Sequence, residues 1–252
     1  MSKCESAVRP ANLRLGCLII LLTLMTGAAT ALAQAAPAVS PYYARTNTFS
    51  VFGAYSGDSS HIFMGDAENR KLLDFGVAYG RKFFLNLIVN WQYNGELLPV
   101  ALESDPVVLN TINLTGPTVH IEYETTVQTT PCVPAFYSFY TYTYTFTCTR
   151  RWTMGEGISP VGFQWNFRPH NKLQPFFIGH GGCMHSTRPI PIPQADSFNF
   201  TFDLGTGFEL YRSQTRSVRA EYRYHHISNH NMANMNPGID NGLFQVTYSF
   251  GR

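Results

Sequence analysis

The sequence predicts an all-β protein, an eight-stranded antiparallel β-barrel that spans a membrane. Eight segments alternate apolar and polar residues with a period of two, which is the pattern of strands with one apolar face. The connections between these segments alternate between short and long, as in barrels with tight turns at one end and long loops at the other. Aromatic residues make up 14% of the chain and charged residues 13%, whereas soluble proteins carry about 25% charged residues.

The predicted strands lie in residues 49–55, 73–79, 85–93, 161–167, 173–182, 198–210, 218–224 and 244–250. We expect short turns at 80–83, 168–172 and 212–216, and long loops at 56–70, 94–157, 183–197 and 228–242. If the N-terminus is periplasmic, all four long loops are external, and residues 94–157 form the longest of them.

Each regular strand carries Phe, Leu, Val, Trp or Tyr on one face and polar residues on the other. The residues expected to face the interior are Asp74, Asn86, Gln164, Asp203, Glu209, Arg219, Glu221 and Arg223. Such a face fills a narrow barrel with paired charges. A soluble two-sheet sandwich also alternates, but it would carry more Lys and Glu on its surface and show no rule of loop length. We therefore predict an outer-membrane β-barrel.

The first 33 residues are predicted to form a secretory signal peptide, which leaves residues 34–252 as the barrel domain. Lys3, Arg9 and Arg14 precede an apolar core at 15–25, and residues 31–33 form a small-residue cleavage site. No later run of 18 apolar residues predicts a membrane-spanning helix. In residues 34–252, 15 Lys and Arg residues balance 15 Asp and Glu residues, so a basic surplus for binding nucleic acid is absent.

A Tyr- and Thr-rich run at 136–147 has strong strand propensity, and Cys132 and Cys148 flank it. We expect a hairpin above the barrel, closed by a Cys132–Cys148 disulfide, because an exported protein meets an oxidising environment. Cys183 would then be the odd thiol. The alternative, in which all three cysteines are unpaired, stays open because pairing depends on geometry.

The candidate chemistry lies in the last two predicted strands. If residues 218–228 form a strand, His226 and Ser228 project from one face, the face of the lipid-facing Tyr222. A turn centred near Asn234 would place Ser228 opposite Asp240, at about 5 Å between Cβ atoms. A serine is a poor nucleophile until a base takes its proton, and a carboxylate can orient that base. The three residues are therefore a candidate catalytic triad.

A second group of residues has features of an oxyanion loop or of a metal cluster. It comprises the glycine-rich run 179–183 with His180, Cys183 and His185. Glycines in a tight barrel make room for bulky neighbours, and these spacings match no strong zinc pattern. We predict no metal and no cofactor. His225 has inward parity and is expected to pair with an interior charge.

The motif His226-x-Ser228-Asn229, followed by Gly238-Ile239 and an acid at position 240, resembles the C-terminal signature of the lipid A 3-O-deacylases, the PagL family. The resemblance implies an outer-membrane enzyme that removes the ester-linked acyl chain at the 3-position of lipid A in lipopolysaccharide. It also implies an acyl-enzyme intermediate and an oxyanion held by Asn229 and the backbone near Asn231. The family pattern has Glu where this chain has Asp240, and Gly where it has Asn231.

Two other functions compete with this interpretation. A non-catalytic small outer-membrane barrel with an adhesion or surface-stability role would need the same strands and no triad. An outer-membrane phospholipase shares Ser and His chemistry, but twelve strands are expected there instead of eight. The sequence leaves open which acyl chain is removed and whether the barrel forms a homodimer.

Overall fold

The computed structural model describes residues 42–114, 119–126 and 132–252. The predicted signal peptide, residues 1–33, lies outside the described residues. Among the residues described, none forms a helix long and apolar enough to cross a membrane.

The described residues form ten strands joined in one antiparallel sheet. The strands are β1 (Asn47–Ser56), β2 (Lys71–Leu85), β3 (Val89–Leu114), β4 (His120–Thr126), β5 (Ala135–Ser138), β6 (Tyr142–Phe167), β7 (Leu173–Ile190), β8 (Asp196–Ser213), β9 (Arg216–Ser228) and β10 (Ile239–Gly251).

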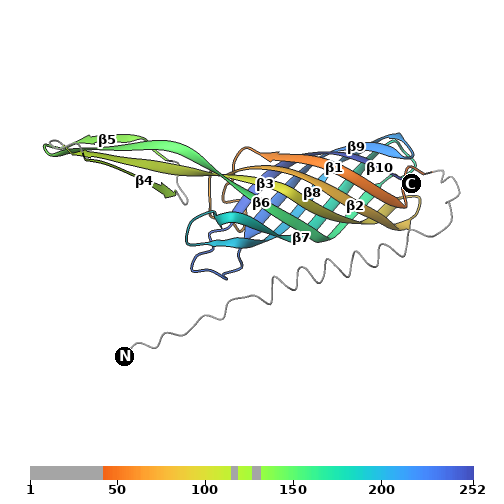
Figure 1. Cartoon of the computed structure of the whole chain (residues 1–252). Coiled ribbons are helices and arrows are strands. Elements are labelled where there is room, and N and C mark those ends of the chain that lie inside the picture. The colour runs from red at the N-terminus through yellow and green to blue at the C-terminus, as the bar shows by residue number, and fades with distance from the viewer. Residues whose placement is uncertain (1–41, 115–118, 127–131) are drawn as a thin grey trace, which may run out of the picture. The chain divides into compact units, whose positions relative to one another are not determined.

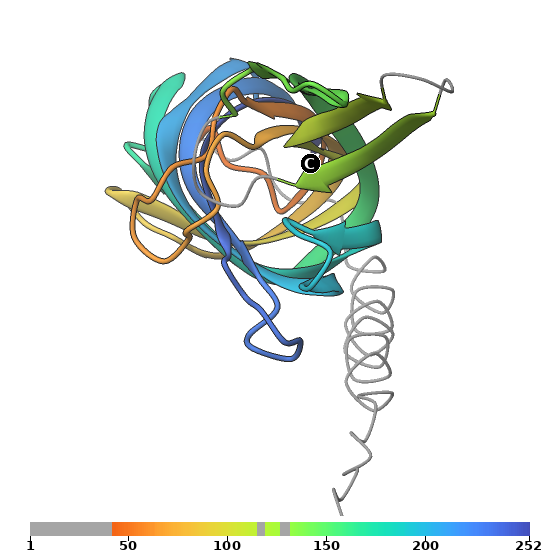
Figure 2. The same cartoon turned by 90° about the vertical axis from the view of Figure 1, so that its left-hand side faces the viewer.

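Eight of these strands close into a barrel, as the sequence predicts. Each pairs with its neighbour in the order β1, β2, β3, β6, β7, β8, β9 and β10. The ring closes where β1 pairs with β10, from Thr48 opposite Gly251 to Tyr55 opposite Phe244. Figure 2 shows this ring of strands from one end. Closure leaves the barrel without an unpaired edge, which is what a membrane requires of a sheet.

The segment expected as one long loop at 94–157 is mostly strand. β3 pairs with β2 only as far as Ser104, and β6 pairs with β7 only from Gly155. Beyond these points β3 and β6 continue as an antiparallel pair, with β4 added on one edge and β5 on the other. Figure 1 shows the two strands continuing past the barrel. The expected disulfide between Cys132 and Cys148 is present in this extension.

The first short turn lies at 86–88 and not at 80–83, so the prediction for this turn was wrong. Gly80 sits within the sheet, paired with Thr48 and Asn94. The turn forms at Asn86 because its side-chain oxygen accepts hydrogen bonds from the backbone NH groups of Ile88 and Val89, both at 2.8 Å. Asn86 is therefore an exposed turn residue and does not face the interior as predicted.

The other seven residues predicted to face the interior are buried or nearly so. The outward face carries exposed aromatic and aliphatic side chains, and near the short turns the aromatic rings gather into a belt. Trp91 and Trp165 stack there with centroids 6.3 Å apart, and Phe83 contacts Trp91 at 5.6 Å. An apolar wall with an aromatic girdle is typical of a barrel in a membrane.

Candidate active site

The candidate site lies on the outward face of the barrel wall, where β9 and β10 reach the long loops. On β9 the even-numbered residues Val218 and Tyr222 are exposed, while the odd-numbered residues between positions 218 and 226 are buried. His226 and Ser228 share the outward parity. Asp240 has the parity of Phe244 on β10, whose ring is 54% exposed. All three residues thus have the outward parity of the barrel wall.

His226 and Asp240 are hydrogen-bonded across the two strands. Nδ1 of His226 lies 2.6 Å from Oδ1 of Asp240. An ionised carboxylate can only accept a hydrogen bond, so Nδ1 carries the proton and Nε2 is left with its lone pair. This tautomer gives His226 a basic nitrogen on the side away from the acid. The histidine is 8% exposed and the aspartate 0%, so water competes little for their bond.

The strand register differs from the prediction by two residues. Asp240 pairs with His226, whereas Ser228 opposite Asp240 was expected. Pairing between β9 and β10 stops at Ile239 and Ile227, and Ser228 instead lies opposite Phe200 of β8. Because side chains alternate with a period of two, this shift keeps all three residues on the same face. The observed register brings the carboxylate of Asp240 into direct contact with the imidazole of His226.

Ser228 is the last residue of β9 and is half-buried. It stands two residues beyond His226, at about 6.6 Å along the strand. Within the described part of the chain, the hydroxyl of Ser228 has no hydrogen bond. Hydrogen bonds between catalytic groups are often long in structures without substrate and shorten in the complex. In the structure Ser228 thus lies beside His226, but their side chains are not hydrogen-bonded to each other.

The loop after Ser228 is held by Asn229, which is buried to 1% exposure. Its side-chain NH₂ donates to the carbonyl of Met235 at 2.8 Å, and its backbone NH donates to Oδ1 of Asn236 at 3.0 Å. His230 and Asn231 follow with φ values of 52° and 59°. Asparagine tolerates this left-handed conformation better than most residues. Asn231 can therefore hold the backbone where the family pattern has glycine.

Asp240 is surrounded by donors from two parts of the chain, the loop between β1 and β2 and strand β9. The backbone NH groups of Phe63 and Met64 donate to its Oδ2 at 2.7 and 2.8 Å. The hydroxyl of Tyr224 donates to its Oδ1 at 2.8 Å, beside the bond from His226. Four donors on one carboxylate stabilise its charged form and fix its orientation. The arrangement can support an imidazolium at His226, as an acyl-transfer reaction requires.

A family model described as lipid A 3-O-deacylase (PagL) matches residues 120–249, which is more than half of the chain and includes His226, Ser228 and Asp240. The chain belongs to the PagL family. This membership agrees with the outer-membrane barrel predicted from the sequence. None of the curated proteins matches the chain.

Among solved structures, the chain is similar to the outer-membrane enzyme PagL, with 11% identity over 82% of this chain and 99% of that one and a TM-score of 0.44. It is also similar to Neisserial surface protein A (NspA), with 9% identity over 82% of this chain and 97% of that one and a TM-score of 0.40. It is also similar to the outer membrane protein OprG from Pseudomonas aeruginosa, with 9% identity over 83% of this chain and 98% of that one and a TM-score of 0.38.

Sequence reasoning missed three of the residues that surround the acid in this PagL-family chain. Tyr224 could have been found, because it lies two residues before His226 and so projects from the same face of β9. Phe63 and Met64 act through their backbone NH groups, which every residue type other than proline carries. Their side chains give no signal of this role.

Inside the barrel, a buried network of charges accounts for the residues that could suggest a metal site. Glu96, His180 and Asp203 could together offer ligand atoms to a metal ion. The guanidinium of Arg223 already contacts all three, bonding both oxygens of Glu96 at 3.0 and 2.8 Å. Arg223 also bonds Glu221 at 2.6 Å. A cation would have to displace this guanidinium, so the geometry is that of a structural ion network.

The glycine-rich run at 179–183 lies in the barrel wall, and its neighbours explain its composition. A Cβ at Gly182 would lie 2.7 Å from Cα of Ser159 on β6, so a side chain would displace the paired strand. Imidazole Nδ1 of His180 lies 2.8 Å from Oδ1 of Asp203. His185 is exposed, with outward parity. These residues therefore do not gather into one cluster.

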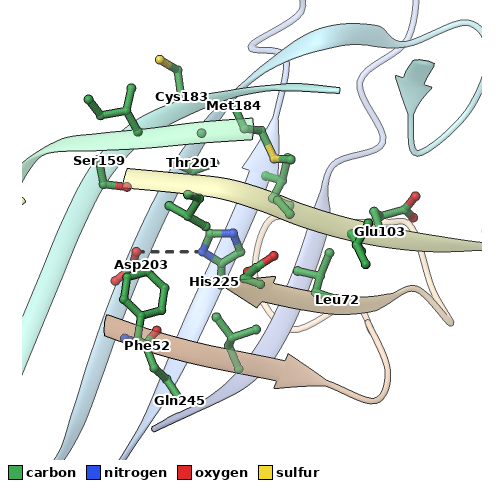
Figure 3. A pocket seen from close by; sticks show the side chains of 18 residues that line it. Phe52, Leu72, Glu103, Ser159, Cys183, Met184, Thr201, Asp203, His225 and Gln245 are labelled. Carbon is green, nitrogen blue, oxygen red and sulfur yellow. Dashed lines mark ion pairs between the residues drawn. The ribbon is translucent and has the colours of Figure 1, made fainter. Parts of the chain in front are cut away.

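A small cavity of about 30 Å³ lies inside the barrel near His225. Figure 3 shows His225 and Asp203 facing one another across it, and the ion pair between them spans 3.9 Å. His225 thus faces an interior charge, as its parity predicts. A cavity of this volume holds about two water molecules and no acyl chain. This cavity is too small for an acyl chain, and the outward face is the side on which a lipid can approach His226.

Proposed function

We propose that this chain is a serine esterase of the outer membrane, a hydrolase that removes the ester-linked acyl chain at the 3-position of lipid A. The observation that carries the proposal is the hydrogen bond between His226 and Asp240 on the outward face of the barrel. Polar and charged side chains on a lipid-facing wall are costly. An enzyme that acts on a lipid of the outer leaflet needs polar side chains at this position.

In the first half of the reaction, Nε2 of His226 takes the proton of Ser228 while Oγ attacks the ester carbonyl carbon. Asp240 stabilises the imidazolium that forms. The tetrahedral intermediate then collapses, its bond to the sugar oxygen breaks, and His226 returns the proton to that oxygen. Lipid A leaves with a free 3-hydroxyl group, and the acyl chain remains bonded to Ser228 as an ester.

In the second half, His226 takes a proton from a water molecule that attacks the acyl-serine. The second tetrahedral intermediate then collapses, its bond to Oγ of Ser228 breaks, and His226 returns the proton to Oγ as the fatty acid leaves. The oxyanion of both intermediates needs donors close to Ser228, and the loop that contains Asn229 and Asn231 is the nearest source. Loss of one such donor lowers the rate by about 10²–10³-fold in serine hydrolases.

The direct test is mass spectrometry of lipid A from bacteria that express this chain. Wild type should produce lipid A that lacks one acyl chain, with a free hydroxyl at the 3-position. Ser228→Ala should leave lipid A intact, although it inserts into the outer membrane in the same amount. Unchanged lipid A with the wild-type barrel present would favour the alternative, a non-catalytic barrel with an adhesion or surface-stability role.

A further inference from the structure

Three consecutive apolar side chains project from the loop between β1 and β2. Ile62, Phe63 and Met64 are 51%, 75% and 47% exposed. We call these three residues the tip. Exposing three large apolar side chains to water is unfavourable. A run of this kind usually marks a contact surface.

The backbone of the tip is fixed to the acid of the proposed triad. Phe63 and Met64 donate their backbone NH groups to Oδ2 of Asp240. On either side of the tip, the NH of Ser60 donates to the carbonyl of Asp240 at 3.2 Å, and the NH of Ala67 donates to the carbonyl of Gly238 at 3.1 Å. The tip thus has little freedom to move without disturbing the carboxylate.

Gly65 sets how closely this segment approaches Asp240. A Cβ at Gly65 would lie 2.6 Å from the backbone N of Asp240 and 2.8 Å from the carbonyl C of Ile239. Both atoms belong to a paired strand, which cannot easily move away. Only glycine allows the backbone to lie this near to the acid.

The tip lies on the lipid-facing side of the barrel wall. Asp240 points outward, so the NH groups that bind its carboxylate must also lie outside the wall. The neighbouring outward side chains Tyr222, Phe244 and Tyr55 are 60%, 54% and 49% exposed, and they belong to the lipid-facing surface. The apolar side chains of the tip extend this surface toward the external loops.

The residues next to the tip are polar, which sets how far the loop can enter a membrane. Nδ1 of His61 lies 3.1 Å from Oδ1 of Asp66, and both side chains are more than 60% exposed. An apolar tip with polar side chains at its base fits the boundary between head groups and acyl chains.

From this arrangement we propose that the tip binds acyl chains of the outer leaflet and that lipid contact thereby holds the backbone NH groups of residues 63 and 64 against Asp240. The occupant is lipid, because the tip continues the lipid-facing wall. The inference rests on the proposed esterase function. It adds a lipid-binding element that also positions the catalytic acid.

Spin labelling tests the lipid contact without any measurement of activity. A nitroxide attached to Phe63→Cys, in phosphatidylethanolamine vesicles that contain lipid A, should be relaxed by oxygen and protected from a water-soluble nickel chelate. The control is Tyr140→Cys in the external hairpin, where the native side chain is 98% exposed. Equal access of the nickel chelate to both labels would overturn the proposal, and this result would stand even if the chain proved to have no esterase activity.

Activity measurements test the link to the acid. The rate on lipid A in vesicles is compared with the rate on p-nitrophenyl butyrate, a soluble ester. The double substitution Ile62→Ser and Phe63→Ser should lower the ratio of the two rates by roughly tenfold, because apolar contact with the membrane is lost. Gly65→Ala should lower both rates together by at least about tenfold, because it displaces the NH groups from the carboxylate.

The matched control is Gly57→Ala in the same loop, where a Cβ would meet Tyr55 at an ordinary 3.6 Å. It should change neither rate. An unaltered rate ratio in the double variant, or full activity of Gly65→Ala on both substrates, would overturn the proposed link. Inactivity of the wild type on both substrates would instead count against the esterase function itself, and the labelling result would still decide the lipid contact.

Discussion

Asp240 lies directly opposite His226 on the neighbouring strand, and their side chains meet at 2.6 Å between Oδ1 and Nδ1. The acid of the family pattern is Glu, one methylene longer than this Asp. The shorter side chain reaches the imidazole because the two residues are direct cross-strand partners. Donors from Tyr224 and from the loop between β1 and β2 hold the carboxylate in place.

Asp240→Asn should lower the rate on lipid A strongly, by as much as ~10⁴-fold, the loss seen when the acid of a serine protease triad is replaced in this way. The amide cannot support the imidazolium and can donate to Nδ1, which favours the wrong tautomer. Asp240→Glu should recover only part of the rate, because the site is fitted to the shorter side chain. Rates in mixed micelles test this, and equal rates for all three proteins would show that another group orients His226.

Tyr224→Phe should lower the rate by roughly tenfold, since a hydrogen bond to a charged group contributes about 1.5–3 kcal/mol. The ring stays, so the lipid-facing surface changes little. Tyr222→Phe, two residues earlier on the same face, is the matched control and should retain the wild-type rate. If the two variants had the same rate, the hydroxyl of Tyr224 would have no part in positioning Asp240.

The eight barrel strands could be predicted because each has one face toward lipid and one toward a narrow polar interior. The continuation of β3 and β6 past the barrel could not, because residues 105–107 of β3 are all buried there and burial does not alternate with a period of two. The first turn was misplaced because Gly80 suggested a turn. Gly80 instead lies within the sheet, where a Cβ would make a tight contact of 3.3 Å with the carbonyl oxygen of Tyr93.

The sequence predicted on which face of the strands the candidate residues lie, but not the geometry between them. Strand parity put His226 and Ser228 on one face, and the outward parity agrees with the structure. The register between β9 and β10 depends on the conformation of the connecting loop, where His230 and Asn231 have positive φ. Positive φ values cannot be predicted from the spacing of residues in the sequence. The NH groups of residues 63 and 64 lie 177 and 176 positions before Asp240 in the sequence. No side-chain type indicates that these NH groups bind the acid.

Arg223→Met should destabilise the folded barrel by about 3–5 kcal/mol, because removing one partner of a buried ion network leaves the other charges uncompensated. Glu96 and Glu221 would lose their closest cationic partner. Arg216→Met, at an exposed position of the same strand, should have little effect. The midpoint of urea unfolding in lipid vesicles measures the difference. Coincident unfolding curves for the two variants would contradict the importance of the network.

Cys148→Ser should loosen the external hairpin while leaving the barrel folded. The disulfide spans 16 residues, and a loop of about this length contributes about 3 kcal/mol in the chain-entropy model. Limited proteolysis of intact cells should then cleave the extension faster than in wild type. Cys183→Ala, which keeps the disulfide, is the control. Equal cleavage rates for wild type and Cys148→Ser would show that strand pairing alone holds the hairpin.

The most direct measurement of the central claim is covalent labelling of the barrel with a fluorophosphonate, followed by mass spectrometry of the labelled peptides. This reagent bonds to a serine only when a neighbouring base has activated it. The account predicts a label on Ser228 in the wild type, much slower labelling in Asp240→Asn and none in His226→Ala. Labelling of a different residue, or equal labelling of Ser228 in all three proteins, would contradict it.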